Sequence, residues 1–324
     1  MISSKFFSCL VFGLGTLASA AQAAETWPNK PIRMIVGYPS GSSPDMQARL
    51  IAEPLARALG QPVVVENKPG ASGNIGADTI AKSTDAHTIG VIGNGPLTSS
   101  KFLYAKLPYD PATDFAPIAL IGTAPLVWVT AKPTTERSPA TFISTLKADG
   151  DKQAYGSIGP GSGGHLGMEL LKQALGIQPI HVPFNGGPPI LSAIIGGQVQ
   201  MTLLPASTVA PLIQAGKLEA VAVTSAKRTP LAPTLASMEE LGVKGVNIEV
   251  WNAVMAPATM PIENQLRLSR ELTKILESRE IRQKLFLQGW KVDEPSAKAL
   301  TVRIKQDSAT YHDIIMRKKI KIDG

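Results

Sequence analysis

Two stretches of the chain decide its fold: Tyr38-Pro39-Ser40-Gly41-Ser42-Ser43-Pro44-Asp45 and Tyr155-Gly156-Ser157-Ile158-Gly159-Pro160-Gly161-Ser162-Gly163-Gly164-His165. An apolar extended run precedes each stretch (residues 32–36 and 153–155), and a helical pattern follows from Pro44 and from Gly164. The start of a helix has unpaired N–H groups and a partial positive charge, so it favours an anion. Two such helix starts predict a cleft that holds one small anionic molecule.

Strands and helices alternate around the first stretch. The pattern predicts strands at residues 32–37, 63–66 and 88–92, and a helix at residues 44–59 with Ser43 as its N-cap. Pro54 conflicts with that helix, because an interior proline removes a hydrogen bond. The β-α-β-α-β order implies a parallel sheet. Asn94 would then lie at the carboxyl end of the third strand, where open α/β sheets bind ligands.

The alternation repeats in a second half of the chain. Two apolar runs, 117–121 and 126–130, are separated by Gly122-Thr123-Ala124-Pro125, and we interpret them as a crossing into a second lobe. A return crossing is expected at residues 249–255. We therefore expect an α/β protein with two lobes, joined by two crossings and separated by a ligand cleft. Lobe 1 would comprise residues 24–125 and 251–324, and lobe 2 residues 126–250.

The first 23 residues have the pattern of a secretory signal peptide. Lys5 precedes the apolar run 6–20, and Ala21-Gln22-Ala23 provides a small-x-small cleavage site. A membrane anchor is the alternative, but the run is shorter than the roughly 18–20 residues that span a bilayer. The only cysteine, Cys9, lies inside this segment. The mature chain would therefore have no disulfide, and its expected location is the periplasm.

The composition is that of a globular protein. Hydrophobic residues make up 44% of the chain and charged residues 18%, with 29 glycines and 26 prolines. The formal net charge is +7, and the basic cluster Arg317-Lys318-Lys319 indicates a solvated tail. Aromatic residues are only 5%, too few for base-stacking surfaces, so we expect no nucleic-acid partner.

Short motifs along nearly the whole mature chain carry a family resemblance. They are Trp27-Pro28-x-Lys30-Pro31-Ile32-Arg33, Val65-Glu66-Asn67-Lys68-Pro69-Gly70-Ala71, Gly73-Asn74-Ile75-Gly76-Ala77, Leu107-Pro108-Tyr109-Asp110-Pro111, Asp114-Phe115-Ala116-Pro117-Ile118, Tyr155-Gly156-Ser157, Gly164-His165-Leu166, His181-Val182-Pro183-Phe184, Ile195-Gly196-Gly197-Gln198-Val199 and Ala222-Val223-Thr224-Ser225. Together and in this order, they resemble the solute-binding receptors of tripartite tricarboxylate transporters, the Bug (Bordetella uptake gene) family.

The resemblance implies a type II periplasmic-binding-protein fold that closes on a small carboxylate, with a tripartite transporter in the membrane as partner. We expect a monomer without cofactor or metal. The resemblance also implies that backbone N–H groups of the two stretches hold the carboxylate. The candidate ligand-binding residues are Tyr38, Ser40, Gly41, Ser42, Ser43, Asp45, Asn94, Ser157, Gly159, Gly161, Ser162, Gly163, Gly164, His165 and Pro205.

Some of these residues have two interpretations. Asp45 near a helix start is either a structural partner of the helix dipole or the acceptor of a ligand ammonium. His165 is either a capping and packing residue or a ligand contact. Trp128 and Trp251 lie at the crossings, where core packing and ligand stacking are both open. Ser42, Leu204 and Asn252 depart from residues common in the family, in the part of the pocket away from the carboxylate.

Rival functions lack their signatures. Residues 159–164 fit G-x-G-x-x-G, but a dinucleotide site needs an acid about 20 residues further on, and none stands there. No serine lies in G-x-S-x-G, and the four histidines lack metal-ligand spacing. Two alternatives stay open beside the non-enzymatic receptor: an exported hydrolase of small esters or amides, and a ligand sensor that docks a signalling protein.

Overall fold

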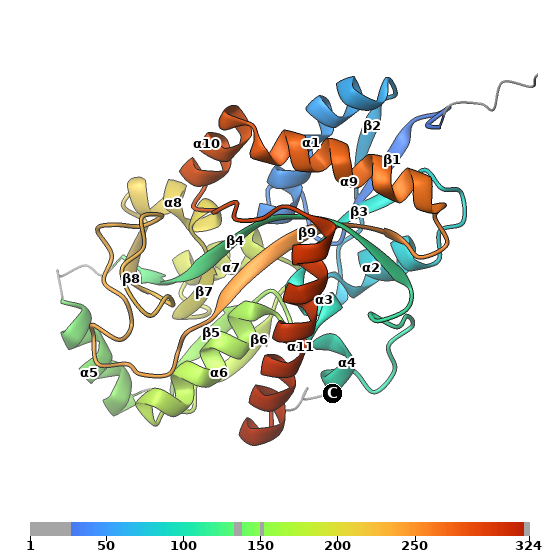
Figure 1. Cartoon of the computed structure of the whole chain (residues 1–324). Coiled ribbons are helices and arrows are strands. Elements are labelled where there is room, and N and C mark those ends of the chain that lie inside the picture. Colours follow the sequence, from blue (N-terminus) through green and yellow to red (C-terminus); the bar gives the residue numbers. More distant parts are fainter. Residues whose placement is uncertain (1–26, 133–137, 150–151, 321–324) are drawn as a thin grey trace, which may run out of the picture.

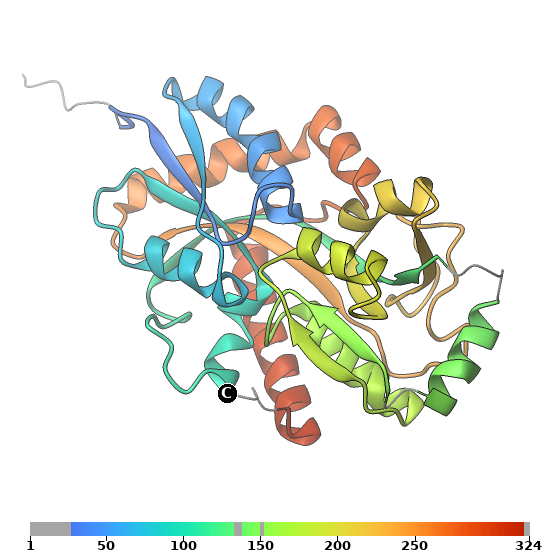
Figure 2. The same cartoon turned by 180° about the vertical axis from the view of Figure 1, so that it is seen from behind.

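The computed structural model describes residues 27–132, 138–149 and 152–320, so the expected signal peptide lies outside the described residues. Two α/β lobes pack side by side and share a nine-stranded sheet with the order β2-β1-β3-β9-β4-β7-β5-β6, in which β8 pairs with β4. Figures 1 and 2 show this arrangement from opposite sides. The predicted fold class is confirmed.

The first lobe is built on parallel strands. Strand β1 pairs with β2 on one side and with β3 on the other, all three parallel, and β3 pairs with the antiparallel β9. This confirms the parallel sheet that the alternation predicts. The elements of this part of the chain are β1 (Ile32–Val36), α1 (Ser43–Leu59), β2 (Val63–Asn67), η1 (Ala71–Gly73), α2 (Asn74–Ala81), β3 (Thr88–Gly93), α3 (Asn94–Leu97) and α4 (Ser100–Leu103).

Helix α1 follows its local sequence signals closely. The N-cap is Ser42 and not the expected Ser43, because the helix begins one residue earlier than predicted. Pro44 lies in the first turn, and Gly60 ends the helix in the left-handed conformation. Pro54 is accommodated inside the helix. The face with Ile51 and Leu55 is fully buried against the sheet. Packing of this face holds the start of α1 at the carboxyl end of β1.

The second lobe repeats the arrangement. Strand β5 pairs in parallel with β6 and β7, and the antiparallel β4 links β7 to β8. Helix α6 starts directly after the second stretch and buries Leu166 and Leu171. The elements are α5 (Pro139–Asp149), β5 (Ala154–Ser157), α6 (Gly163–Leu175), β6 (Ile180–Pro183), α7 (Gly187–Ile195), β7 (Met201–Pro205), α8 (Ala206–Gln214) and β8 (Leu218–Val223).

The crossings are two long antiparallel strands, β4 (Phe115–Ala131) and β9 (Glu249–Pro257). The two apolar runs expected on either side of residues 122–125 form one continuous strand. Residues 122–125, expected to interrupt it, still pair with β9. Gly122 pairs with Asn252, and Thr123 exchanges backbone hydrogen bonds of 2.9 and 2.8 Å with Lys291. Any relative motion of the lobes must therefore bend two paired strands.

The C-terminal helices are α9 (Ile262–Glu277), α10 (Arg279–Leu287) and α11 (Ala297–Lys318). Figure 1 shows α9 and α10 over the first lobe and α11 running from there towards the second. Leu300 packs in a core of the first lobe, whereas Tyr311 and Ile315 pack in the core of the second. Helix α11 is thus a third connection between the lobes. No helix in the described ranges is long and apolar enough to cross a membrane.

Candidate functional site

The two helix starts face each other across a small cavity of about 50 Å³ between the lobes. Helix α1 contributes from the first lobe and helix α6 from the second. Seven of the predicted site residues line it: Tyr38, Ser43, Asn94, Ser162, Gly163, Gly164 and Pro205. The other lining residues are Pro44, Gly93, Gly95, Leu126, Ile158, Leu203, Leu204, Val250, Asn252 and Trp290. The structure therefore brings together parts of the chain that both stretches predicted.

At the starts of α1 and α6, three backbone N–H groups of residues that line this cavity are free to bind a ligand. Ser43, Gly163 and Gly164 occupy the first turns of their helices, and among the described residues none of their N–H groups has an acceptor. The first turn of a helix cannot satisfy its own N–H groups, and both helix dipoles add positive potential here. A carboxylate placed between the helices would receive hydrogen bonds from both lobes.

The rest of the first stretch shapes the loop and does not line the cavity. The Asp45 carboxylate accepts hydrogen bonds from Gly41 N–H (2.9 Å), Asn67 Nδ2 (2.9 Å) and Arg49 Nε (3.1 Å), with Ser40 Oγ at 3.4 Å. Burial alone would raise the pKa of Asp45, but these hydrogen bonds hold the pKa below its ordinary value. Asp45 is therefore ionised and fully engaged. This geometry matches the structural interpretation of Asp45.

Ser42 also acts within its own loop. Its hydroxyl donates to the Pro39 carbonyl at 2.6 Å, and its N–H donates to the same carbonyl. The side chain gives no cap hydrogen bond to α1. The first N–H groups of that helix stay unpaired as a result, which is what an anion site requires.

His165 fixes the loop formed by the second stretch, residues 155–165. The N–H of Gly161 donates to His165 Nδ1 at 3.1 Å, so this N–H is not available to a ligand. Gly161 has φ +78°, a left-handed conformation that favours glycine. The His165 ring stacks on His181 with 4.4 Å between centroids. Burial first, then His181 and Lys172, lower the pKa of His165 to about 3, so the ring is a neutral acceptor near neutral pH.

His165 should make stability depend on pH. Its pKa in the folded protein lies below the ordinary value of about 6.5, so the unfolded chain binds the proton more readily. Its contribution is complete above about pH 6.5 and is lost as the pH falls towards 3, at up to about 1.4 kcal/mol per pH unit. His165→Asn keeps a hydrogen-bond acceptor for the Gly161 N–H but cannot take up a proton. The free energy of unfolding, measured with urea at about pH 7 and about pH 5, should therefore fall less between these two pH values than in the unchanged protein.

His312 offers the matched control. It lies on the exposed surface of α11 beside Asp313 and Phe102, away from the second stretch, so His312→Asn shows the effect of removing a histidine outside that stretch. Equal pH slopes for His165→Asn and His312→Asn would contradict the role assigned to His165.

Ser157 and His181 form a pair that the sequence patterns missed. Ser157 Oγ lies 2.7 Å from His181 Nε2, the geometry of a nucleophile and its base. However, Ser157 is fully buried and does not line the cavity. Its hydroxyl also accepts from Gly159 N–H at 3.0 Å. The pair therefore supports the loop, because no substrate reaches the hydroxyl in this arrangement.

Two lining residues come from distant parts of the chain. Trp290 is 1% exposed and donates from Nε1 to Ser207 Oγ at 3.2 Å, and Asn252 donates from Nδ2 to Gln47 Oε1 at 2.9 Å. The tryptophan at the cavity is thus Trp290 and not Trp251. Trp251 packs in the first lobe and donates to Asp307 at 2.6 Å, while Trp128 packs against Phe142.

The lobes touch around the cavity. Ser43 Oγ lies 2.6 Å from Ser207 Oγ, and Ser99 Oγ donates to the Gly161 carbonyl at 2.5 Å. On another side, a Cβ added to Gly159 would lie 2.2 Å from Ser72 Oγ. These contacts join lobe 1 to lobe 2, so the structure represents a closed arrangement.

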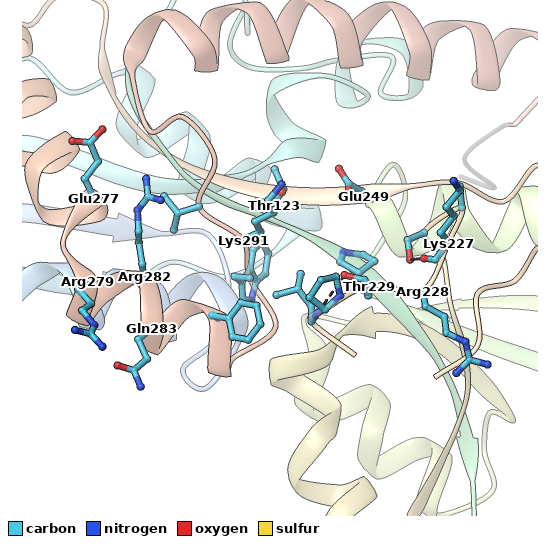
Figure 3. A pocket seen from close by; sticks show the side chains of 18 residues that line it. Thr123, Lys227, Arg228, Thr229, Glu249, Glu277, Arg279, Arg282, Gln283 and Lys291 are labelled. Atoms are coloured by element: carbon cyan, nitrogen blue, oxygen red, sulfur yellow. Dashed lines mark hydrogen bonds between the residues drawn. The ribbon is translucent and has the colours of Figure 1, made fainter. Parts of the chain in front are cut away.

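A second, larger hollow lies on the outside of the crossings (Figure 3). It has a volume of about 1090 Å³ and includes Thr123, Glu249 and Lys291. Lys227 and Arg228 lie at one end, while Arg279 and Arg282 of α10 lie at the other. Trp290 lines both hollows. The inner cavity is the candidate ligand site because the two helix starts meet there. Among the described residues, no group of three or more His, Cys, Asp or Glu side chains has the arrangement of a metal site.

Comparisons with known proteins agree with this geometry. The model of the tripartite tricarboxylate transporter receptor family matches residues 47–320. Protein BugT of Bordetella pertussis is 34% identical over 273 residues, 84% of this chain and 84% of that protein. An R. palustris structure with adipate has a TM-score of 0.87 at 32% identity, covering 91% of this chain and 99% of that one. MatC from Rhodopseudomonas palustris with bound malate has a TM-score of 0.83 at 27% identity, covering 89% and 100%.

Proposed function

The chain belongs to the tripartite tricarboxylate transporter receptor family, and we propose that it captures a small carboxylate between its lobes in the periplasm and delivers it to the membrane components of such a transporter. The observation that carries the proposal is the set of free N–H groups of Ser43, Gly163 and Gly164 around one cavity. Adipate and malate are bound in two structural relatives, which supports a carboxylate here.

The family consists of solute-binding receptors, and we propose that this chain likewise performs no catalysis and acts as a monomer. Native mass spectrometry of the purified protein, before and after mild denaturation, should release an unaltered small acid. Titration calorimetry with that acid should give one site per chain. Release of a chemically altered acid at a steady multiple-turnover rate would instead support the hydrolase alternative.

We propose that residues 123–128 and 249–252 form the hinge, at the boundary between residues 24–125 with 251–324 and residues 126–250. A ligand that binds only the folded, closed form must raise stability, by about 2.7 kcal/mol at a hundredfold excess over Kd. We expect a higher melting temperature and, in solution scattering, a smaller radius of gyration with ligand. A radius that stays constant at saturation would contradict closure about this hinge.

A further inference from the structure

The hydroxyl of Tyr311 on helix α11 forms a bridge between the two lobes beside the inner cavity. Asn94 Nδ2 donates to the Tyr311 hydroxyl at 2.8 Å, and this hydroxyl donates to the Glu249 carbonyl at 3.2 Å. Tyr311 is 3% exposed and packs in the core of the second lobe. Asn94 follows strand β3 of the first lobe and lines the cavity. One buried hydroxyl therefore connects a residue of the ligand cavity with a crossing strand.

This hydroxyl bridge spans the proposed hinge segment of β9. Gly93, directly before Asn94, pairs with Asn252 in the sheet, so Asn94 is tied to one end of the segment. Tyr311 is tied to the other end, at Glu249. Rotation of the lobes about this segment changes the separation of its two ends. The hydrogen bond between Asn94 and Tyr311 is consequently sensitive to the arrangement of the lobes.

Further contacts anchor α11 to the same crossing strand. Trp251 Nε1 donates to the Asp307 carboxylate at 2.6 Å. Arg303 pairs with Asp307 at 2.9 Å and with Glu249 at 3.5 Å. These contacts fix the helix to β9 independently of the hydroxyl bridge. Removal of the Tyr311 hydroxyl leaves them in place, so the bridge can be broken without releasing the helix.

The segment that begins at Asn94 also touches the second lobe at the mouth of α6. Ser99 is fully buried and donates from its hydroxyl to the Gly161 carbonyl at 2.5 Å. A Cβ added to Gly95 would lie 3.3 Å from the same carbonyl oxygen. Both contacts join residues of different lobes, so opening of the lobes breaks them. Asn94 thus lies in a segment whose surroundings depend on closure.

We propose that Tyr311 is a positioning residue of the ligand site: its hydroxyl fixes the Asn94 amide at the cavity, and the hydrogen bond between them forms when the lobes close. This inference rests on the proposed carboxylate-receptor function. A bond that exists only in the closed form adds to ligand affinity, because the ligand selects that form. A bond present in both forms would add to stability and leave affinity unchanged.

Tyr311→Phe tests the proposal, because it removes the hydroxyl and keeps the ring that packs in the second lobe. Titration calorimetry would use the acid released from the purified protein, with adipate and malate, the acids bound in two structural relatives, beside it. We expect the affinity to fall at least about fivefold, since Asn94 Nδ2 loses its buried acceptor in the closed form. The melting temperature of the ligand-free variant should fall less than that of Tyr109→Phe.

Tyr109→Phe is the matched control. The Tyr109 hydroxyl is also buried, but it lies 2.6 Å from Asn74 Oδ1 and 3.0 Å from the Pro96 carbonyl, both in the first lobe. These contacts exist in either arrangement of the lobes, so this variant should melt at a lower temperature and bind with nearly unchanged affinity. If Tyr311→Phe behaves in the same way, its bond is a static structural contact. The inference is then overturned, and the carboxylate-receptor function stands.

A double-mutant cycle with Asn94→Ala tests whether the effect of Tyr311 runs through Asn94. In the Asn94→Ala background, Tyr311→Phe should cause no further loss of affinity. An equal loss in both backgrounds would contradict the positioning role. If none of these acids binds to the unchanged protein, the carboxylate-receptor function fails together with the inference.

Discussion

Gly163→Ala should weaken ligand binding by at least about tenfold. Gly163 has no left-handed backbone conformation, so alanine can adopt its geometry, but the added Cβ would lie 2.3 Å from Val250 Cγ1. Val250 belongs to the crossing strand β9. To relieve this overlap, the start of α6 must retreat from β9 and carry its N–H groups away from Ser43. A hydrogen bond to a charged group contributes about 1.5–3 kcal/mol, and about 1.4 kcal/mol is a factor of ten in affinity.

The same overlap supplies a rescue experiment. Val250→Ala removes Cγ1, so the double variant Gly163→Ala/Val250→Ala should recover most of the affinity that Gly163→Ala loses. Calorimetry on the four proteins of this cycle gives the coupling energy, and melting temperatures verify that each is folded. If Gly163→Ala binds the ligand with unchanged affinity, the ligand lies away from α6. If the double variant binds as weakly as Gly163→Ala, the overlap with Val250 is not the cause of the lost affinity.

Local signals made both helix starts predictable. Ser42 and Ser43 before Pro44, and Ser162 before Gly163, are N-terminal signals that need no tertiary context, and each helix begins within one residue of its expected position. Asn94 was placed by topology alone, because parallel strands end at one edge of a sheet. The two-lobed class followed from the repeated alternation in the same way.

The identity of the free N–H groups could not be read from the sequence. Glycine content marks where a backbone can approach a ligand, but the N–H of Gly161 is occupied by His165 and the N–H of Gly41 by Asp45. Those bonds depend on how each loop folds back on its own helix. Trp290 was missed for a related reason. It follows α10 far from either stretch, and only packing of the C-terminal segment on β4 brings it to the cavity.

Ser43→Pro should remove one ligand hydrogen bond without disturbing the fold. Ser43 is the first residue of α1, where proline is favoured because its missing N–H has no helical partner. Ser42 has φ −72° and ψ 158°, the extended conformation required of a residue before proline. The variant should therefore melt normally. Its affinity for the captured acid should fall about 10- to 150-fold, the effect of losing one charge-assisted hydrogen bond of about 1.5–3 kcal/mol.

Ser43→Ala is the matched control, because it keeps the N–H. Both variants lose the hydroxyl that contacts Ser207 and Thr208 across the cleft. A loss of affinity that both variants share therefore reports on closure of the lobes. The difference in affinity between them reports on the backbone N–H alone. If the two variants bind equally, the Ser43 N–H does not contact the ligand. The carboxylate would then depend on Gly163 and Gly164, and α1 would contribute only the field of its dipole, which salt screens.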